Sequence, residues 1–256
     1  MIKAAIEAAK AAGDIQLKHY RKVKTITKKG AKDFFTNVDI ACEKAIITII
    51  RKSHPNHSFL SEEAGSIDAG SGYLWIIDPL DGTTNYAHSY PCFCASAGLE
   101  IDGEVVTGAV YNPMLDELFT SVKGEGAYLN GNRIRVSKIA DINKSLLATG
   151  FPYDIRESKE NNLNHFCNFA VRAQAIRRPG SAVLDLCYLA AGRFDGFWEL
   201  KLYPWDMAAS SLIVKESGGM ITDFKGSEFS IYKGEMLASN GLIHKEMINI
   251  LNLATD

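Results

Sequence analysis

Acidic residues follow apolar, strand-like segments at two points in the sequence. The segment Trp75–Ile77 leads directly into Asp78, and Asp81 follows three residues later. Glu62 comes just after a second strand-like segment, Ser58–Leu60. Carboxylates at the end of a buried strand are costly unless a positive charge compensates them. Because two carboxylates that flank a turn can point at the same place, this pattern indicates a site for a hard divalent cation.

A backbone suited to anions follows Asp81. This residue begins the run Asp-Gly-Thr-Thr, and free backbone N–H groups at Gly82 and Thr83 can receive a phosphate, as helix N-termini do. Carboxylates that bind a cation beside such a backbone indicate metal-assisted phosphate chemistry. Asp-Gly turns are common, so a simple turn role for Asp81 stays open.

A further carboxylate, Asp206, lies in the first turn of a predicted helix that Pro204 opens. The helix macrodipole favours a carboxylate there, so an N-capping role for Asp206 also stays open. Together with Glu62, these aspartates supply the oxygen ligands that Mg²⁺ needs beside a substrate phosphate. The sequence offers no evident Ser–His or Cys–His pair for covalent catalysis. The five cysteines lack a zinc-ligand spacing and are predicted to be reduced and mostly buried.

Helical and strand-like patterns alternate in blocks. Apolar residues at i, i+3 and i+4 predict helices in the first 53 residues, separated by a charged mobile loop that includes residues 28–33. Short apolar segments between Gly, Asn, Asp and Pro predict strands from 73 to 129, and Asn130-Gly131 predicts a hairpin. Helices are predicted at 182–191, 206–217 and 242–253, with strands at 194–199 and 236–238. Interleaved blocks of this kind are typical of a layered α/β sandwich.

Composition sets limits on the class of protein. The chain has 256 residues, a formal charge of −2 and 46% hydrophobic residues, which is typical of a globular protein with a full core. A charge near zero argues against direct nucleic-acid binding. Apolar runs are far shorter than the roughly 18 residues of a membrane span, and the N-terminus lacks the apolar core of a secretory signal. We therefore expect a cytoplasmic protein without membrane partners. We also expect residues 1–256 to form a single domain.

Several long motifs resemble those of the inositol monophosphatase family. They are the segment from Trp75 to Asn85, the segment from Trp205 to Ala209, Glu62-Glu63, and the segment from Arg177 to Leu186. The segments occur in the family's order and with fitting spacing, and they resemble most closely its bacterial branch. The resemblance implies the α/β/α/β/α sandwich of the inositol monophosphatase and fructose-1,6-bisphosphatase type. Residues 1–140 would carry the metal-site motif and 141–256 the Trp-Asp motif.

The resemblance also implies a role for individual residues. The positions that match the family's ligands for two or three Mg²⁺ ions are Glu62, Asp78, the Leu80 carbonyl, Asp81 and Asp206. Glu62 and Thr83 would activate the attacking water, with Asp39 polarising the Thr83 hydroxyl. Substrate contacts would come from Asp81, Gly82, Thr83, Arg177, Gly180, Ala182, Glu199 and Asp206. Lys28 and Asp33, in the predicted mobile loop, would lie near the phosphate and a weakly held third ion.

The activity implied is hydrolysis of inositol-1-phosphate and similar polyol or sugar phosphates by metal-activated water, in a homodimer. Fructose-1,6-bisphosphatase activity, alone or in addition, is an alternative. Thr84 argues against the nucleotide-phosphatase branch, which usually has Lys there. The bacterial branch includes a homologue that acts in ribosomal RNA antitermination. A transcription-factor partner, with catalysis dispensable, is therefore the alternative from another class.

Overall fold

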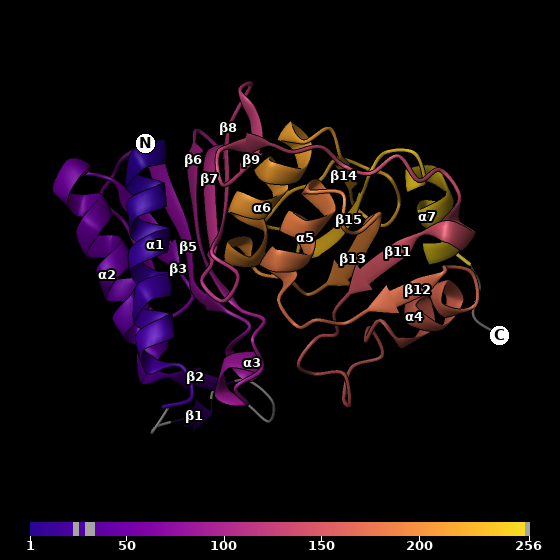
Figure 1. The fold of residues 1–256 in the computed structure, drawn as a ribbon, viewed down its shortest axis with the longest axis horizontal. Coiled ribbons are helices and arrows are strands. Elements are labelled where there is room, and N and C mark those ends of the chain that lie inside the picture. The colour runs from indigo at the N-terminus through magenta and orange to yellow at the C-terminus, as the bar shows by residue number, and fades with distance from the viewer. Residues whose placement is uncertain (23–25, 29–33, 254–256) are drawn as a thin grey trace.

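The computed structural model describes residues 1–22, 26–28 and 34–253, which form five layers (Figure 1). Two N-terminal helices cover one face of an eight-stranded sheet, and two further helices lie between this sheet and a five-stranded sheet. The last two helices cover the outer face of the second sheet. In layer order, the helices are α1 (Ile2–His19) and α2 (Asn37–Ser53), α5 (Ala182–Ala190) and α6 (Pro204–Glu216), then α4 (Leu163–Ala170) and α7 (His244–Leu251). The expected α/β/α/β/α sandwich is confirmed.

The first sheet is antiparallel except where β3 runs parallel to β5. Its strands, in the order in which they pair, are β10 (Asn132–Arg133), β9 (Gly126–Leu129), β8 (Glu117–Val122), β7 (Glu104–Asn112), β6 (Cys94–Ile101), β5 (Tyr73–Asp81), β3 (Ser58–Ser61) and β4 (Gly65–Ile67). Asn130 and Gly131 join β9 to β10 with φ values of 49° and 78°, so the predicted hairpin is confirmed.

The second sheet is mixed. Its strands pair in the order β12 (Ala175–Arg177), β11 (Leu146–Thr149), β13 (Gly196–Leu200), β15 (Glu235–Ser239) and β14 (Met220–Thr222). Strand β11 is parallel to both of its neighbours, whereas β15 is antiparallel to both of its own. The sequence analysis did not predict β11, β12, β14 or α4, because these elements are too short to show a clear period.

Three hydrophobic cores fill the spaces between the layers. One joins α1 and α2 to the first sheet, one surrounds α5 and α6, and one lies between the second sheet and the outer helices. Helix α6 is buried from Met207 to Val214, as expected of a helix that is covered on both sides. Helix α2 instead buries a single stripe that includes Cys42, Ile46 and Ile50.

Two glycines allow α6 to lie directly on the first sheet. A Cβ at Gly108 of β7 would lie 2.8 Å from the Ala209 carbonyl oxygen, and one at Gly98 of β6 would lie 3.0 Å from the Ala209 nitrogen. Real Cβ atoms essentially never come closer than 3.0 Å to such atoms, so α6 would have to move away from a larger residue at 108. This close packing determines how near the N-terminus of α6 comes to β5.

The N-terminal region contains more than the predicted helices. Strands β1 (Ile26–Lys28) and β2 (Phe34–Thr36) form an antiparallel pair between α1 and α2. The predicted mobile loop therefore begins within a strand, and its residues 29–33, Asp33 included, lie outside the described residues. The five cysteines are free, and Cys42, Cys94 and Cys187 are buried. Two short helices complete the fold, α3 (Thr83–Ala87) and the 3₁₀ turn η1 (Ile142–Lys144).

Candidate active site

A bulge at the end of β5 brings Asp78 and Asp81 to the same side of the sheet. Asp78 lies opposite Ser96 of β6, whereas Asp81 lies opposite Cys94, so three steps along β5 match two along β6. In a regular strand, side chains three residues apart point to opposite faces. The bulge adds one residue to β5 between Asp78 and Asp81, and this extra residue places both side chains on the same face. The sequence analysis expected a turn here, but the strand continues to Asp81.

The carboxylates of Asp78, Asp81 and Asp206 converge. Each offers one carboxylate oxygen, and the three oxygens lie within 4.8 Å of one another. Asp206 is the third residue of α6, where its Oδ2 accepts a hydrogen bond from the Tyr203 N–H at 2.7 Å. Asp206 therefore caps the helix and also faces the other two aspartates, so the capping alternative is only part of its role.

Burial raises the pKa of each carboxyl in this acidic trio, and neighbouring carboxylates raise the pKa of Asp78 and Asp206 further. Burial is the largest cause for all three. The charges of Glu62, Asp81 and Asp206 further raise the pKa of Asp78, and the charge of Asp81 raises that of Asp206. Asp81 has a pKa of about 6, because hydrogen bonds from Ser181 and Val183 oppose the burial effect. Ionising all three carboxyls together is therefore unfavourable unless a positive charge lies beside them.

This set of donors fits a hard divalent cation. Among the described residues, no Lys, Arg or His forms an ion pair with Asp78, Asp81 or Asp206. Buried carboxylates without a basic partner require some other positive charge. Oxygen ligands in this number are the ones that Mg²⁺ prefers, in combination with water and substrate phosphate.

A cavity of about 110 Å³ contains most of the predicted site. The predicted residues that line it are Glu62, Asp78, Leu80, Asp81, Gly82, Thr83, Gly180, Ala182, Glu199 and Asp206. They come from the C-terminal ends of β3 and β5 in the first sheet, from the start of α3, from the N-termini of α5 and α6, and from β13. A second cavity of about 380 Å³ adjoins it and shares Asp81, Thr83 and Gly180. The structure thus brings together residues from both halves of the sequence.

Asp39 lies behind Thr83 and not in the cavity. The Thr83 Oγ1 lies 3.1 Å from Asp39 Oδ1 and 2.9 Å from the Leu80 carbonyl oxygen. Asp39 is fully buried in the first turn of α2, where it forms a capping box with Thr36. Burial raises the pKa of Asp39, and the hydrogen bonds from Thr36 and Thr83 partly oppose this. The Thr83 hydroxyl thus has two acceptors, the Asp39 carboxylate and the Leu80 carbonyl.

Asp81 is also tied to the N-terminus of α5. Its Oδ2 accepts hydrogen bonds from the Ser181 hydroxyl and, at 3.0 Å, from the Val183 N–H. Gly180 precedes this N-terminus with a φ of +90°, and a Cβ there would lie 2.7 Å from an Arg178 nitrogen. The sequence analysis matched Gly180 and Ala182 to the site but not Ser181, whose position at the N-cap was the available signal.

One predicted contact, Arg177, lies elsewhere, and the side chain of Lys28 lies outside the described part of the structure. Arg177 is exposed, its guanidinium donates to the Ile176 carbonyl at 3.1 Å, and it does not line the cavity, whereas Arg178 does. Lys28 ends β1, but the structure does not describe its side chain. The structure therefore does not bring Arg177 to the other predicted contacts.

Gln16 is a buried residue that the sequence analysis missed. From α1 its Nε2 donates to the Pro79 carbonyl at 2.9 Å and to the Cys94 carbonyl at 3.1 Å. These two carbonyls border the bulge between Asp78 and Asp81. The signal was a polar residue on the apolar face of the first predicted helix, which indicates a buried polar contact.

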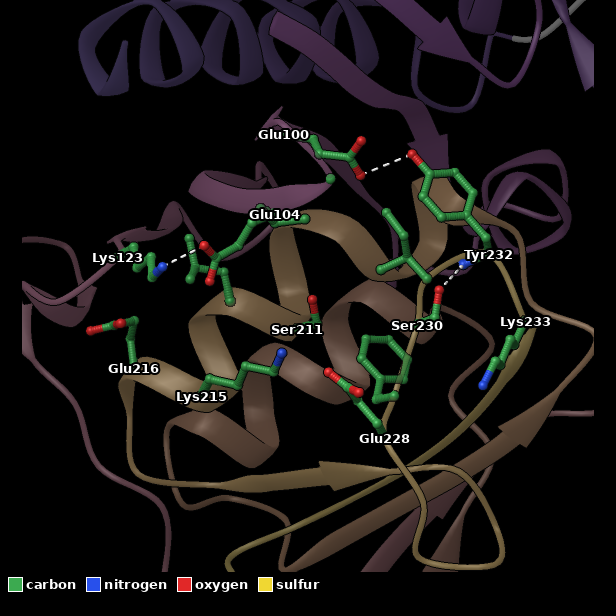
Figure 2. Close-up of a pocket in the computed structure, with 15 residues that line it drawn as sticks. Glu100, Glu104, Lys123, Ser211, Lys215, Glu216, Glu228, Ser230, Tyr232 and Lys233 are labelled. Carbon is green, nitrogen blue, oxygen red and sulfur yellow. Dashed lines mark hydrogen bonds and ion pairs between the residues drawn. The ribbon is translucent and has the colours of Figure 1, made fainter. Parts of the chain in front are cut away.

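A cavity of about 550 Å³ lies elsewhere, between β6, β7, α6 and residues 228–233 (Figure 2). Its charged groups do not converge. Lys123 forms an ion pair with Glu104, and Glu100 accepts a hydrogen bond from the Tyr232 hydroxyl at 2.8 Å. Glu216 accepts hydrogen bonds from the backbone N–H groups of residues 124 and 126. These acidic groups bind partners within the fold, in contrast to the acidic trio.

Known proteins resemble the chain over nearly its whole length. The family model for the inositol monophosphatase family matches residues 1–254. An inositol-1-monophosphatase from Synechocystis is 44% identical over 252 residues, covering 98% of this chain and 88% of that protein. A protein named Nus factor SuhB from Salmonella typhimurium is 42% identical over 251 residues, covering 97% and 94%.

Solved structures agree with these sequence matches. The inositol monophosphatase from Anabaena superposes with a TM-score of 0.90 at 43% identity, covering 98% of this chain and 94% of that one. An inositol monophosphatase from Thermotoga maritima has a TM-score of 0.88 at 37% identity, covering 96% and 94%. Within the described ranges, no helix is long and apolar enough to cross a membrane. On the evidence of fold, site and similarity over the whole length, the chain belongs to the inositol monophosphatase family.

Proposed function

We propose that the protein is a Mg²⁺-dependent phosphomonoesterase that hydrolyses inositol-1-phosphate and similar polyol or sugar phosphates. Membership of a phosphatase family supports the reaction class, and the Synechocystis relative bears the name of this activity. The observation that carries the proposal is the acidic trio, whose carboxylate oxygens converge within 4.8 Å at the wall of a cavity. A phosphate monoester is an anion, so these carboxylates can face it only with cations between them.

Glu62, Asp78, the Leu80 carbonyl, Asp81 and Asp206 would hold the ions. When bound, Mg²⁺ neutralises charge on the phosphate and leaving group and lowers the pKa of the attacking water. Asp78 is central, because its pKa responds to Glu62, Asp81 and Asp206 alike. The N–H groups of Gly82 and Thr83, at the start of α3, would hold the phosphate oxygens.

Glu62 and Thr83 orient the attacking water in this proposal. Asp39 would accept a hydrogen bond from the Thr83 hydroxyl, which leaves the Thr83 oxygen able to accept a hydrogen bond from the water. Glu62 would take one proton from that water as general base. Its position beside Asp78 in the cavity supports this role.

The polyol would occupy the far end of the cavity, against Glu199, Gly180 and Ala182. Glu199 extends from β13 toward Gly150, where a Cβ would lie 1.9 Å from its Oε1, so glycine at 150 leaves room for this carboxyl. Burial raises the pKa of Glu199 to about 8, and Arg178 opposes the shift. A carboxyl held in this way suits hydroxyl groups and rejects a substrate that lacks them.

Phosphate release from a panel of esters tests the proposal. The panel contains inositol-1-phosphate, fructose-1,6-bisphosphate, 3′-phosphoadenosine 5′-phosphate and NADP, with Mg²⁺ titrated and EDTA as the control. We expect turnover that requires Mg²⁺ and is fastest with inositol-1-phosphate. Fastest turnover of the bisphosphate would favour the fructose-1,6-bisphosphatase alternative. Absence of turnover across the panel by folded, Mg²⁺-loaded protein would contradict the proposed activity.

A second candidate function is association with the transcription machinery, because the relative from Salmonella is named a Nus factor. This role requires a surface, whereas the phosphatase requires the trio. Asp78→Asn separates the two roles, because it removes one charge from the trio and leaves the surface unchanged. A transcription factor that is captured equally by wild type and variant would support the second role. The expected homodimer remains a prediction, which sedimentation velocity checks.

A further inference from the structure

Asp185 is a buried acid that has no hydrogen-bond partner among the described residues. It is the fourth residue of α5, is 1% exposed, and lines the same cavity as Asp81 and Glu199. Neither of its carboxyl oxygens accepts a hydrogen bond from the residues that the structure describes, and its Oδ1 is wholly buried. Burying such a group without a partner destabilises the fold. A carboxyl in this state at a cavity wall requires an explanation.

Arg178 and Glu199 are the charged neighbours of Asp185. Burial raises the pKa of Asp185, the charges of Glu199 and Asp81 raise it further, and Arg178 opposes these effects. All three side chains line the cavity, yet within the described part of the chain no ion pair or hydrogen bond joins Arg178 to either carboxyl. The three groups thus surround a space without binding one another.

A polyol can bind all three groups at once. Each hydroxyl donates one hydrogen bond and accepts others, so neighbouring hydroxyls match a set that combines carboxyl acceptors with a guanidinium donor. Glu199 approaches from β13 and Asp185 from α5, that is, from different layers. Two acceptors placed in this way contact different hydroxyls of one ring.

We propose that Asp185 is a specificity-determining residue that accepts a hydrogen bond from a ring hydroxyl of the substrate, beside the contact that Glu199 makes. This inference rests on the proposed phosphatase function and names a residue for its choice of substrate. A purely structural role is the competing explanation, since an acid near a helix N-terminus stabilises the helix. The two explanations predict different kinetics.

The experiment compares Asp185→Ala and Asp185→Asn with wild type on two Mg²⁺-dependent reactions. Inositol-1-phosphate carries ring hydroxyls, whereas phenyl phosphate has none on its leaving group. For Asp185→Ala we expect KM for inositol-1-phosphate to rise about tenfold, with kcat/KM for phenyl phosphate within about twofold of wild type. Asp185→Asn preserves the side-chain shape and one acceptor oxygen, so its KM for inositol-1-phosphate should lie close to that of wild type. This second variant keeps the test valid if the alanine variant unfolds.

Asp195→Ala is the matched control. Asp195 is 5% exposed, but its carboxylate accepts hydrogen bonds from the Ser137 hydroxyl and, at 2.7 Å, from the Leu146 N–H, and it does not line the cavity. Its replacement should lower the melting temperature and leave KM unchanged for both substrates. Equal losses on both substrates in the Asp185 variants, or an unchanged KM for inositol-1-phosphate, would overturn the inference.

Failure of the inference differs from failure of the proposed function. If wild type hydrolyses neither ester with Mg²⁺, the phosphatase proposal fails and the role of Asp185 fails with it. If wild type hydrolyses phenyl phosphate but not inositol-1-phosphate, phosphatase chemistry stands and recognition of ring hydroxyls is excluded. If both esters are hydrolysed and the Asp185 variants keep the wild-type ratio of kcat/KM values, only the inference is wrong.

Discussion

Asp78 at the end of β5 and Asp206 in the first turn of α6 present carboxylate oxygens within 4.8 Å of each other across the boundary between a sheet and a helix. The bulge in β5 orients Asp78, and the packing of α6 on Gly98 and Gly108 brings Asp206 near it. The distance between these two carboxylates therefore depends on the strand bulge beside Asp78 and on the close packing of α6 against the sheet.

Asp81→Asn and Asp206→Asn should each lower kcat/KM by at least about a hundredfold, because each removes a charged ligand from the proposed metal site. The metal-free variants should melt at or above the temperature of wild type, since the substitution relieves repulsion between buried carboxylates. Steady-state kinetics and differential scanning calorimetry measure both effects. Near-normal turnover in either variant would contradict the metal assignment.

Stability of the metal-free protein should increase as the pH falls from 8 to 5. The folded-state pKa of Asp81 is about 6 and that of Glu199 about 8, both above the values of the unfolded chain. The folded protein thus binds more protons than the unfolded chain, and it loses this stability as the pH rises through those values.

Mg²⁺ should reverse this trend, because it binds the deprotonated ligands. We expect 5 mM Mg²⁺, roughly the concentration of a standard assay, to raise the melting temperature more at pH 8 than at pH 5. Thermal melts across the pH series, with EDTA as the control, measure the difference. A shift that is the same at both values would show that the acidic trio does not bind the ion.

Gly108→Ala should lower kcat/KM as well as stability. The added Cβ would lie 2.8 Å from the Ala209 carbonyl oxygen, so α6 and its Asp206 must shift. Overpacking of this kind costs roughly 1–3 kcal/mol of stability. Gly219→Ala is the control, because it crowds Val214 at the opposite end of α6, and it should lower the melting temperature without a comparable loss of kcat/KM. Equal kinetic effects would exclude the positioning argument.

Thr83→Val should lower kcat by roughly a hundredfold or more, because it removes the hydroxyl between Asp39 and the proposed water while keeping the side-chain shape. Thr83→Ser keeps the hydroxyl and should retain most of the activity. The comparison of kcat between the two variants is the measurement. A valine variant as active as the serine variant would exclude a role for this oxygen in catalysis.

The chemistry of the site was largely predictable from sequence. Acids after strand-like segments indicated a cation, and the segment from Trp75 to Asn85 carried both the proposed ligands and the proposed phosphate-binding turn. The hairpin at Asn130-Gly131 was predictable because few residues other than Gly, Asn and Asp adopt positive φ at both turn positions. Such local features depend on neighbours in the sequence.

The contacts of Arg178 and Gln16 were not predictable in this way. Periodicity indicates that a helix has a buried face but not which backbone carbonyls a glutamine on that face will meet. Which of the two arginines, Arg177 or Arg178, lines the cavity depends on which side of β12 and of the following loop faces it. Side chains alternate along a strand, so a shift of one residue exchanges the two arginines.

The sequence by itself determined the candidate metal ligands, the layered α/β class and the family, because residue types, their periods and long motifs are local properties of the chain. Only the tertiary structure decided that Asp78 and Asp81 share a face, that Asp206 caps a helix and also meets them, and that Asp185 is buried without a hydrogen-bond partner among the described residues. These facts depend on a strand bulge and on the packing of α6 against the sheet. Both arise from contacts between residues that are distant in the sequence.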